Sequence, residues 1–190
     1  MLRRALALEW TTLGWNVAGV LVLSVAAWRA RSVALTGFGL DSLIEIGASF
    51  VVLWELSGSH EARTLRALAL VRSAFLLVAA YLLVQGVLAL LSRHHAAHSA
   101  LGIVWTALSA VVMFTLAGAK ATTGRAIASP IVMAEGRVTL IDGVLAVSIL
   151  IALTLNALLS WWWADLVAGF VVTGYALREA NTLRKTQSPP

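Results

Sequence analysis

The sequence predicts an all-α integral membrane protein with six transmembrane helices, for three reasons. Apolar residues make up 60% of the 190 residues, the mean hydropathy is +0.89, and only 12% of the residues are charged. A water-soluble domain of this length would have too few polar residues to cover its surface. Six apolar segments have about the 20 residues that a helix needs to cross a bilayer, and short polar breaks separate them.

The first expected helix covers residues 6–28. Its apolar stretch is longer than the roughly 7–15 residues of a secretory signal, and it contains Glu9 and Asn16, so we expect it to stay in the protein. The next spans are expected at residues 33–56, 67–91, 100–121, 132–159 and 163–180. Residues 1–180 would then form one membrane domain, followed by a short polar cytoplasmic tail at 181–190.

The distribution of Lys and Arg predicts the orientation. With both termini in the cytoplasm, the cytoplasmic segments hold Arg3, Arg4, Arg63, Arg66, Lys120, Arg125, Arg178, Arg184 and Lys185, and the opposite side holds Arg29, Arg31 and Arg93. This asymmetry satisfies the positive-inside rule. The net charge of +5 therefore reflects membrane topology, and we expect a lipid bilayer and no nucleic acid as a partner. Interfacial anchoring is expected for the tryptophans at span ends, Trp28, Trp54 and Trp161 to Trp163.

Acidic residues in the second and fifth spans predict a functional site. Asp41 and Glu45 are four residues apart, so a helix places them on one face. Asp142 lies at a similar depth in the fifth span. A carboxylate inside a membrane is costly by about 2.5–3.5 kcal/mol, and such residues mark ion pathways by default. The three carboxylates are therefore expected to bind a cation near the midplane.

Two further acids are expected nearer the cytoplasm. Glu135 precedes Asp142 by two helical turns, and Glu9 lies at a comparable level in the first span. These two could form an inner antechamber for the ion. For Glu9, structural pairing with a base such as Arg72 is an equally good interpretation. Asp165 is expected to cap a helix or lie at the interface, since acids are common at such positions.

The ligand chemistry follows from composition. The chain has no cysteine, so a metal would be bound by oxygen, with histidine as a further option. His94, His95 and His98 form a loop cluster, although short histidine-rich loops are usually just solvated. Three buried carboxylates cannot all remain ionised without a cation, and a divalent metal must displace the protons that they hold. Competition between metal and proton at an alternately exposed site is sufficient for antiport.

The residues around Asp41 and Glu45 resemble the second transmembrane helix of the cation diffusion facilitators, in which two metal ligands are separated by three residues. The first span around Glu9 and the approach to the sixth span are similar to a short bacterial branch, and the resemblance covers residues of about 6 to 180. It implies a six-helix, usually dimeric transporter that exports Zn²⁺ or a related divalent ion against protons. By position, Asp41 and Glu45 would be the second-helix ligands and Asp142 the fifth-helix ligand. We expect a short form without the cytoplasmic C-terminal domain of the family.

One departure from the family pattern affects the choice of ion. Val138 stands where the fifth helix of the family commonly has a histidine ligand. An all-oxygen site suits harder ions such as Mn²⁺, although Zn²⁺ also accepts carboxylates. Thr139, Asn16 or water could fill the missing position.

A second class of function remains open. Faces of small residues, such as Gly14 with Ala18, favour helix packing, so the chain could be a scaffold or assembly subunit that does not transport. An enzyme is not indicated, and no prosthetic group is expected beyond the transported ion. We expect a homodimer held by membrane helices in a bacterial inner membrane.

Overall fold

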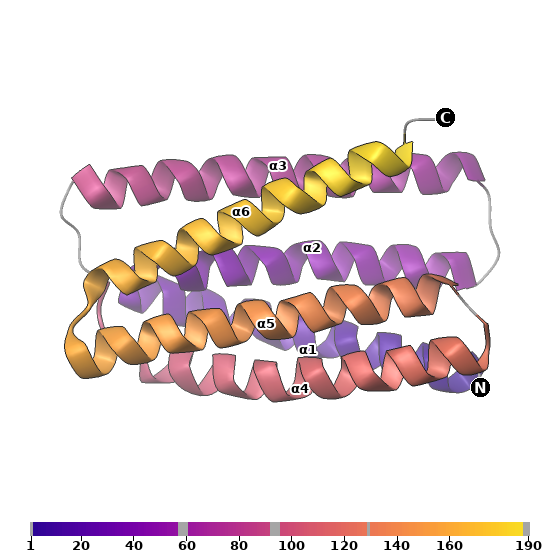
Figure 1. Ribbon diagram of the computed structural model, residues 1–190, viewed down its shortest axis with the longest axis horizontal. Coiled ribbons are helices and arrows are strands. Elements are labelled where there is room, and N and C mark those ends of the chain that lie inside the picture. The colour runs from indigo at the N-terminus through magenta and orange to yellow at the C-terminus, as the bar shows by residue number, and fades with distance from the viewer. Residues whose placement is uncertain (1, 57–60, 92–95, 129, 188–190) are drawn as a thin grey trace.

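Six long helices make up the fold. The structure is a computed structural model that describes residues 2–56, 61–91, 96–128 and 130–187. The helices are α1 (Leu2–Ala30), α2 (Val33–Leu56), α3 (Glu61–Leu91), α4 (Ala100–Ala126), α5 (Pro130–Leu159) and α6 (Trp162–Gln187). They run up and down, so that both ends of the chain lie at the same end of the bundle (Figure 1). The predicted all-α fold with six helices is confirmed.

The observed helices extend the expected spans. α2 covers residues 33–56, as predicted, whereas α1, α3, α4 and α5 continue beyond the expected limits at one or both ends. α6 runs to Gln187, so residues 181–187 of the expected polar tail are helical. Among the described residues, three stretches are long and apolar enough to cross a membrane, Arg3–Ala30, Ala100–Ala126 and Glu135–Leu159, and α3 adds the shorter apolar stretch Phe75–Leu91.

The helices pack most extensively in three pairs: α1 with α2, α4 with α5, and α3 with α6. α6 crosses the bundle diagonally, from the end of α5 toward α3 (Figure 1). α2 also touches α3, α5 and α6. The acids of α2 are therefore placed at the centre of the bundle.

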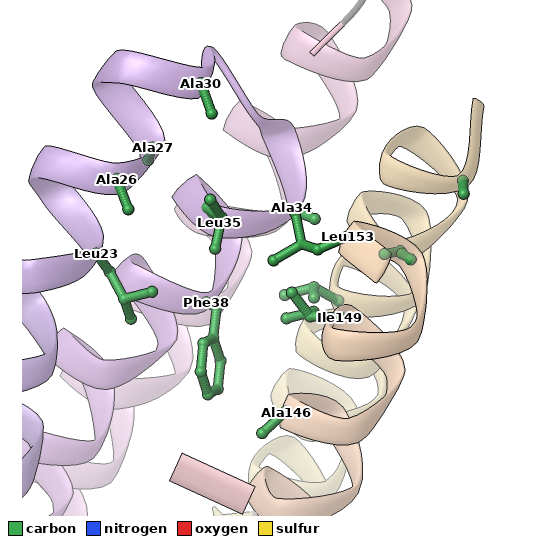
Figure 2. Packing of buried hydrophobic residues seen from close by; sticks show 14 of the residues in the cluster. Leu23, Ala26, Ala27, Ala30, Ala34, Leu35, Phe38, Ala146, Ile149 and Leu153 are labelled. Atoms are coloured by element: carbon green, nitrogen blue, oxygen red, sulfur yellow. The ribbon is translucent and has the colours of Figure 1, made fainter. Parts of the chain in front are cut away.

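The apolar core takes residues from all six helices. Leu23, Leu35, Phe38 and Ile149 are at most 3% exposed and pack around small residues such as Ala146 (Figure 2). Lipid tails are as apolar as these side chains, so close van der Waals packing stabilises the helix contacts in a membrane.

Glycines let α4 and α5 approach each other closely. A Cβ atom on Gly124 would lie 2.8 Å from Met133 Cγ and 2.9 Å from Met133 N. A Cβ atom on Gly136 would lie 3.2 Å from both Ala121 N and Lys120 Cβ. Small residues at such positions allow backbones to pack at short range. This contact fixes the relative height of Lys120 and the acids of α5.

An acidic cap fixes the start of α2. Asp165, in the first turn of α6, accepts hydrogen bonds from Ser32 Oγ and from Val33 N, the latter at 3.0 Å. Ser32 Oγ in turn accepts one from Leu35 N at 3.0 Å. Free N–H groups at a helix start need such acceptors. The prediction of a capping role for Asp165 is confirmed, and the helix that it caps is the one carrying Asp41 and Glu45.

Candidate metal centre

Asp41 and Glu45 both face the interior of the bundle. Their exposed fractions are 4% and 6%, and the spacing of four residues places them about one turn apart, roughly 6 Å along the axis of α2. Ile44, which lies beside them in sequence, belongs to the same buried apolar cluster as Phe75 of α3. The inward face of α2 therefore carries two acids beside an apolar contact.

Asp142 reaches the same region from α5. It is 1% exposed, and neither of its carboxylate oxygens has a hydrogen-bond partner; Glu45 Oε1 is also buried without one. The electrostatic interactions resolved for Asp142 are with other acids, in order Glu45, Asp41 and Glu135. Buried polar atoms are almost always satisfied, so these oxygens need an explanation. The region is acidic, as a site that binds a cation would be.

The three carboxylates are neighbours, but they do not form a closed coordination shell. Within the part of the chain that the structure describes, no three acidic or histidine side chains are gathered as a ready metal site. The structure thus brings Asp41, Glu45 and Asp142 into one buried region on facing helices. Binding by all three would require their side chains to move inward.

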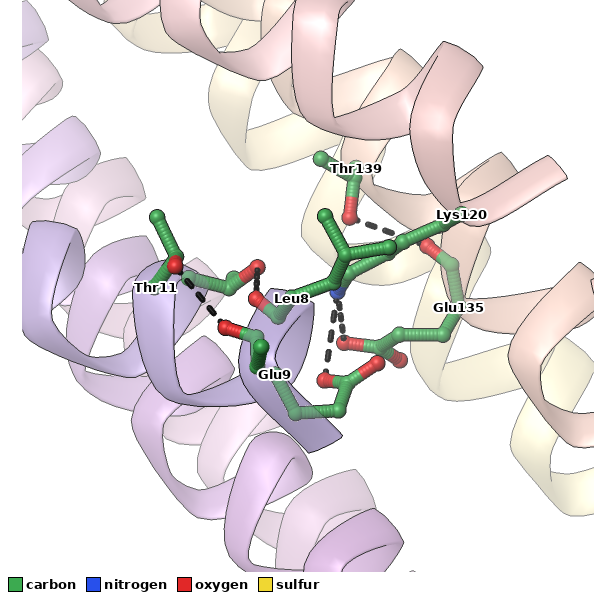
Figure 3. Close-up of polar contacts among 8 residues, drawn as sticks. Leu8, Glu9, Thr11, Lys120, Glu135 and Thr139 are labelled. Atoms are coloured by element: carbon green, nitrogen blue, oxygen red, sulfur yellow. Dashed lines mark hydrogen bonds and ion pairs between the residues drawn. The ribbon is translucent and has the colours of Figure 1, made fainter. Parts of the chain in front are cut away.

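Glu9 and Glu135 come together, as expected, but around a lysine. Lys120 Nζ lies 3.2 Å from Glu9 Oε2 and 3.3 Å from Glu135 Oε1 (Figure 3). Lys120 and Glu9 are fully buried, and Glu135 is 7% exposed. Lys120, which was expected in a cytoplasmic segment, has its side chain buried inside the bundle. The expected pairing of Glu9 with a base is present, but the base is Lys120 and not the suggested Arg72. Lys120 is the next-to-last residue of the expected span 100–121, and α4 continues five residues past that span, to Ala126, so the lysine lies within the helix.

The suggested neutral ligands have different surroundings. Thr139 is fully buried, and its hydroxyl donates to the Glu135 carbonyl oxygen at 3.0 Å. Asn16 is 1% exposed and its Nδ2 has no partner. Val138 is half-buried and offers no ligand atom. The position at which the resemblance implies a histidine therefore holds an apolar side chain.

Two residues of α6 that lie near the acids were not predicted as site residues from the sequence. Tyr175 packs edge to face on Phe75, with ring centroids 6.1 Å apart, and lies within electrostatic range of Asp142 and Asp41. Glu179, one turn further along α6, interacts electrostatically with Asp41. The spacing of four residues between them was the signal available, since it places both on one helical face.

The histidine loop stays untested as a metal-capture site. His98 is exposed, and His94 and His95 lie outside the described residues. Trp28, Trp161 and Trp163 are exposed at helix ends, as interfacial anchors would be, and the side chain of Trp54 lies outside the described part.

Comparison with known proteins decides the family. The model of the cation efflux transmembrane domain matches residues 10–187, which is almost the whole chain. The chain belongs to the cation efflux family. No curated protein matches it significantly.

Membership gives the general activity of this cation efflux protein. Proteins of the family carry metal cations across membranes and are transporters rather than enzymes. The apolar helices and the family together make the chain a multi-pass membrane protein whose substrates are metal ions.

Proposed function

We propose that this cation efflux protein exports a divalent first-row metal ion from the cytoplasm in exchange for protons, and that Asp41, Glu45 and Asp142 bind the ion. The carrying observation is the set of buried carboxylate oxygens that lack donors, on Asp142 and Glu45. A bound divalent ion or a shared proton would satisfy them. Either occupant excludes the other, because metal ligands must be deprotonated.

The donor set supports a hard or borderline ion. Asp41, Glu45 and Asp142 supply only oxygen, and Val138 replaces the histidine that would add nitrogen. Oxygen ligands suit Mn²⁺, and Zn²⁺ also binds carboxylates. We propose that both ions are accepted and that Zn²⁺ is bound less selectively than at a site containing histidine.

The wider arrangement is also part of the proposal. Both termini would face the cytoplasm of a bacterial cell, in its inner membrane. Gly14 is exposed on α1, and a Cβ atom there would meet nothing within 4 Å. This open face leaves room for a helix of a second copy, in agreement with a homodimer built from membrane helices.

A scaffold that does not transport is the second candidate. It is favoured by the lack of a preassembled three-ligand cluster among the described residues and by Val138 in place of histidine. In that case Asp41 and Asp142 would be remnants of an ion site.

Transport into proteoliposomes separates the two candidates. The wild-type protein should accumulate Mn²⁺ or Zn²⁺ with proton flux in the opposite direction. The isosteric variants Asp41→Asn, Glu45→Gln and Asp142→Asn should each reduce flux at least about 100-fold, since even outer-shell partners of metal ligands contribute about 10–100-fold. Ser148→Ala is the matched control on α5, because its hydroxyl bonds only to the carbonyl oxygen of Val144. Absence of flux in the folded wild type supports the scaffold, and full flux in Asp142→Asn rejects the site.

A further inference from the structure

Lys120 is a positive charge held inside the bundle by acids from two other helices. Its ammonium lies between the carboxylates of Glu9 on α1 and Glu135 on α5, at 3.2 and 3.3 Å (Figure 3). A lysine at membrane depth is unfavourable on its own, so the two carboxylates account for its placement. Glu9 and Glu135 thus bind a cation that the protein itself supplies, the ammonium of Lys120.

The charges in this arrangement do not balance. Two carboxylates face one ammonium, so one negative charge is left over when all three groups are ionised. In addition, Glu9 Oε1 is buried and has no hydrogen-bond partner. A monovalent ammonium thus satisfies the pair of acids only in part. A divalent ion would match their charge and could also bind the vacant oxygen.

The position of the pair relates it to the proposed ion site. Glu45 interacts electrostatically with Glu9, with Glu135 and with Asp142. Glu135 precedes Asp142 by seven residues, which is about 10 Å along α5 toward the end where the chain termini lie. Glu9 and Glu135 therefore lie between that end of the bundle and the three central acids.

We propose that Glu9 and Glu135 form a second divalent-cation site, which the Lys120 ammonium occupies until a metal ion displaces it. Lysine suits this role because its charge sits on a flexible four-carbon chain that can swing away. Metal and ammonium exclude each other by like-charge repulsion at short range. Return of the ammonium after the ion has moved on blocks its way back. The inference goes beyond the proposed function, because binding at this pair can be measured with the central acids removed.

Metal binding to the purified full-length chain tests the proposal. In the background Asp41→Asn/Glu45→Gln, which removes the central site, Mn²⁺ binding is measured by equilibrium dialysis. Adding Lys120→Met should create one Mn²⁺ site per chain, at least tenfold tighter than any binding in the background alone. Further addition of Glu9→Gln should abolish this Mn²⁺ binding. When Lys120→Arg replaces Lys120→Met in the same background, the positive charge is kept and no Mn²⁺ site should appear. A folded Lys120→Met protein without this site overturns the proposal, whether or not the wild type transports.

A second measurement uses the wild-type chain, in case loss of the lysine prevents folding. The sequence contains two lysines, Lys120 and Lys185, which can be compared in one experiment. Brief treatment with acetic anhydride, read by mass spectrometry, reports how accessible each amine is. Mn²⁺ should raise acetylation of Lys120 at least threefold relative to Lys185. In the control, a buffer without divalent ions that contains Na⁺ at the same ionic strength should leave this ratio unchanged. Unchanged acetylation of Lys120 at saturating Mn²⁺ contradicts displacement.

Discussion

Because α4 packs closely on α5, we expect substitution of two glycines of α4 by alanine to have different effects on the free energy of unfolding. In Gly124→Ala the new Cβ atom would lie 2.8 Å from Met133 Cγ and 2.9 Å from the backbone Met133 N. Gly118→Ala is the matched control, because a Cβ atom there would meet nothing within 4 Å. Both variants gain about 1 kcal/mol from the better helix propensity of alanine, so this gain cancels in the comparison.

The remaining difference is the cost of overpacking. Normal carbon contacts are about 3.5–4.0 Å, so α5 would have to move by roughly 0.5–1 Å at Met133. Such strain costs about 1–3 kcal/mol, and we expect Gly124→Ala to be less stable than Gly118→Ala by this amount. The free energy of unfolding can be measured by titration with SDS in mixed micelles, followed by tryptophan fluorescence and circular dichroism. Equal stability of the two variants would refute the claim that the glycine is needed for helix contact.

Two further predictions concern the cap of α2 and the effect of pH. Asp165→Ala removes the acceptor of Ser32 Oγ and Val33 N, so it should lower the free energy of unfolding by about 1–3 kcal/mol, and Asp165→Asn, which keeps one oxygen, by less. An equal loss in both variants would show that the cap does not act through its hydrogen bonds. If Asp41, Glu45 and Asp142 bind the metal, affinity for Mn²⁺ should rise between about pH 6 and 8, because protons compete for the same oxygens. Isothermal titration at several pH values measures this, and a flat profile argues against proton exchange at the site.

The sequence was sufficient to predict the helices because their signal is strong and local. Apolar segments of membrane length, broken by charged and small polar residues, gave the range of α2 without error and the start of α4 at residue 100. Helix ends were harder, because a helix can extend past the bilayer into water. For α6, nothing in the polar sequence from Asn181 onward marks a stop, and the helix continues to Gln187.

The burial of the acids could be predicted from the sequence, whereas the residues that pair with them could not. Asp41, Glu45 and Asp142 are rare charges in apolar segments, so their burial follows from sequence alone. Lys120 follows the small residues Ala117, Gly118 and Ala119 and precedes Ala121, which places it at the apparent end of a span. Its burial depends on carboxylates contributed by α1 and α5, and such a contact exists only in the folded bundle.

Charge accounting connects the lysine to the proposed exchange of ions. Apart from Asp165, which caps α2, five carboxylates are buried in the described interior, and Lys120 offers them one positive charge: Glu9, Asp41, Glu45, Glu135 and Asp142. A region of low dielectric constant cannot hold four unbalanced negative charges, so protons or metal ions must supply the rest. Every divalent ion that enters therefore replaces positive charge already present, either protons at the central acids or the ammonium at Glu9 and Glu135. Exchange then follows because the number of buried carboxylates fixes how much positive charge the interior holds. A variant that adds one more carboxylate, such as Val138→Asp, should therefore bind one additional proton per chain in the metal-free state.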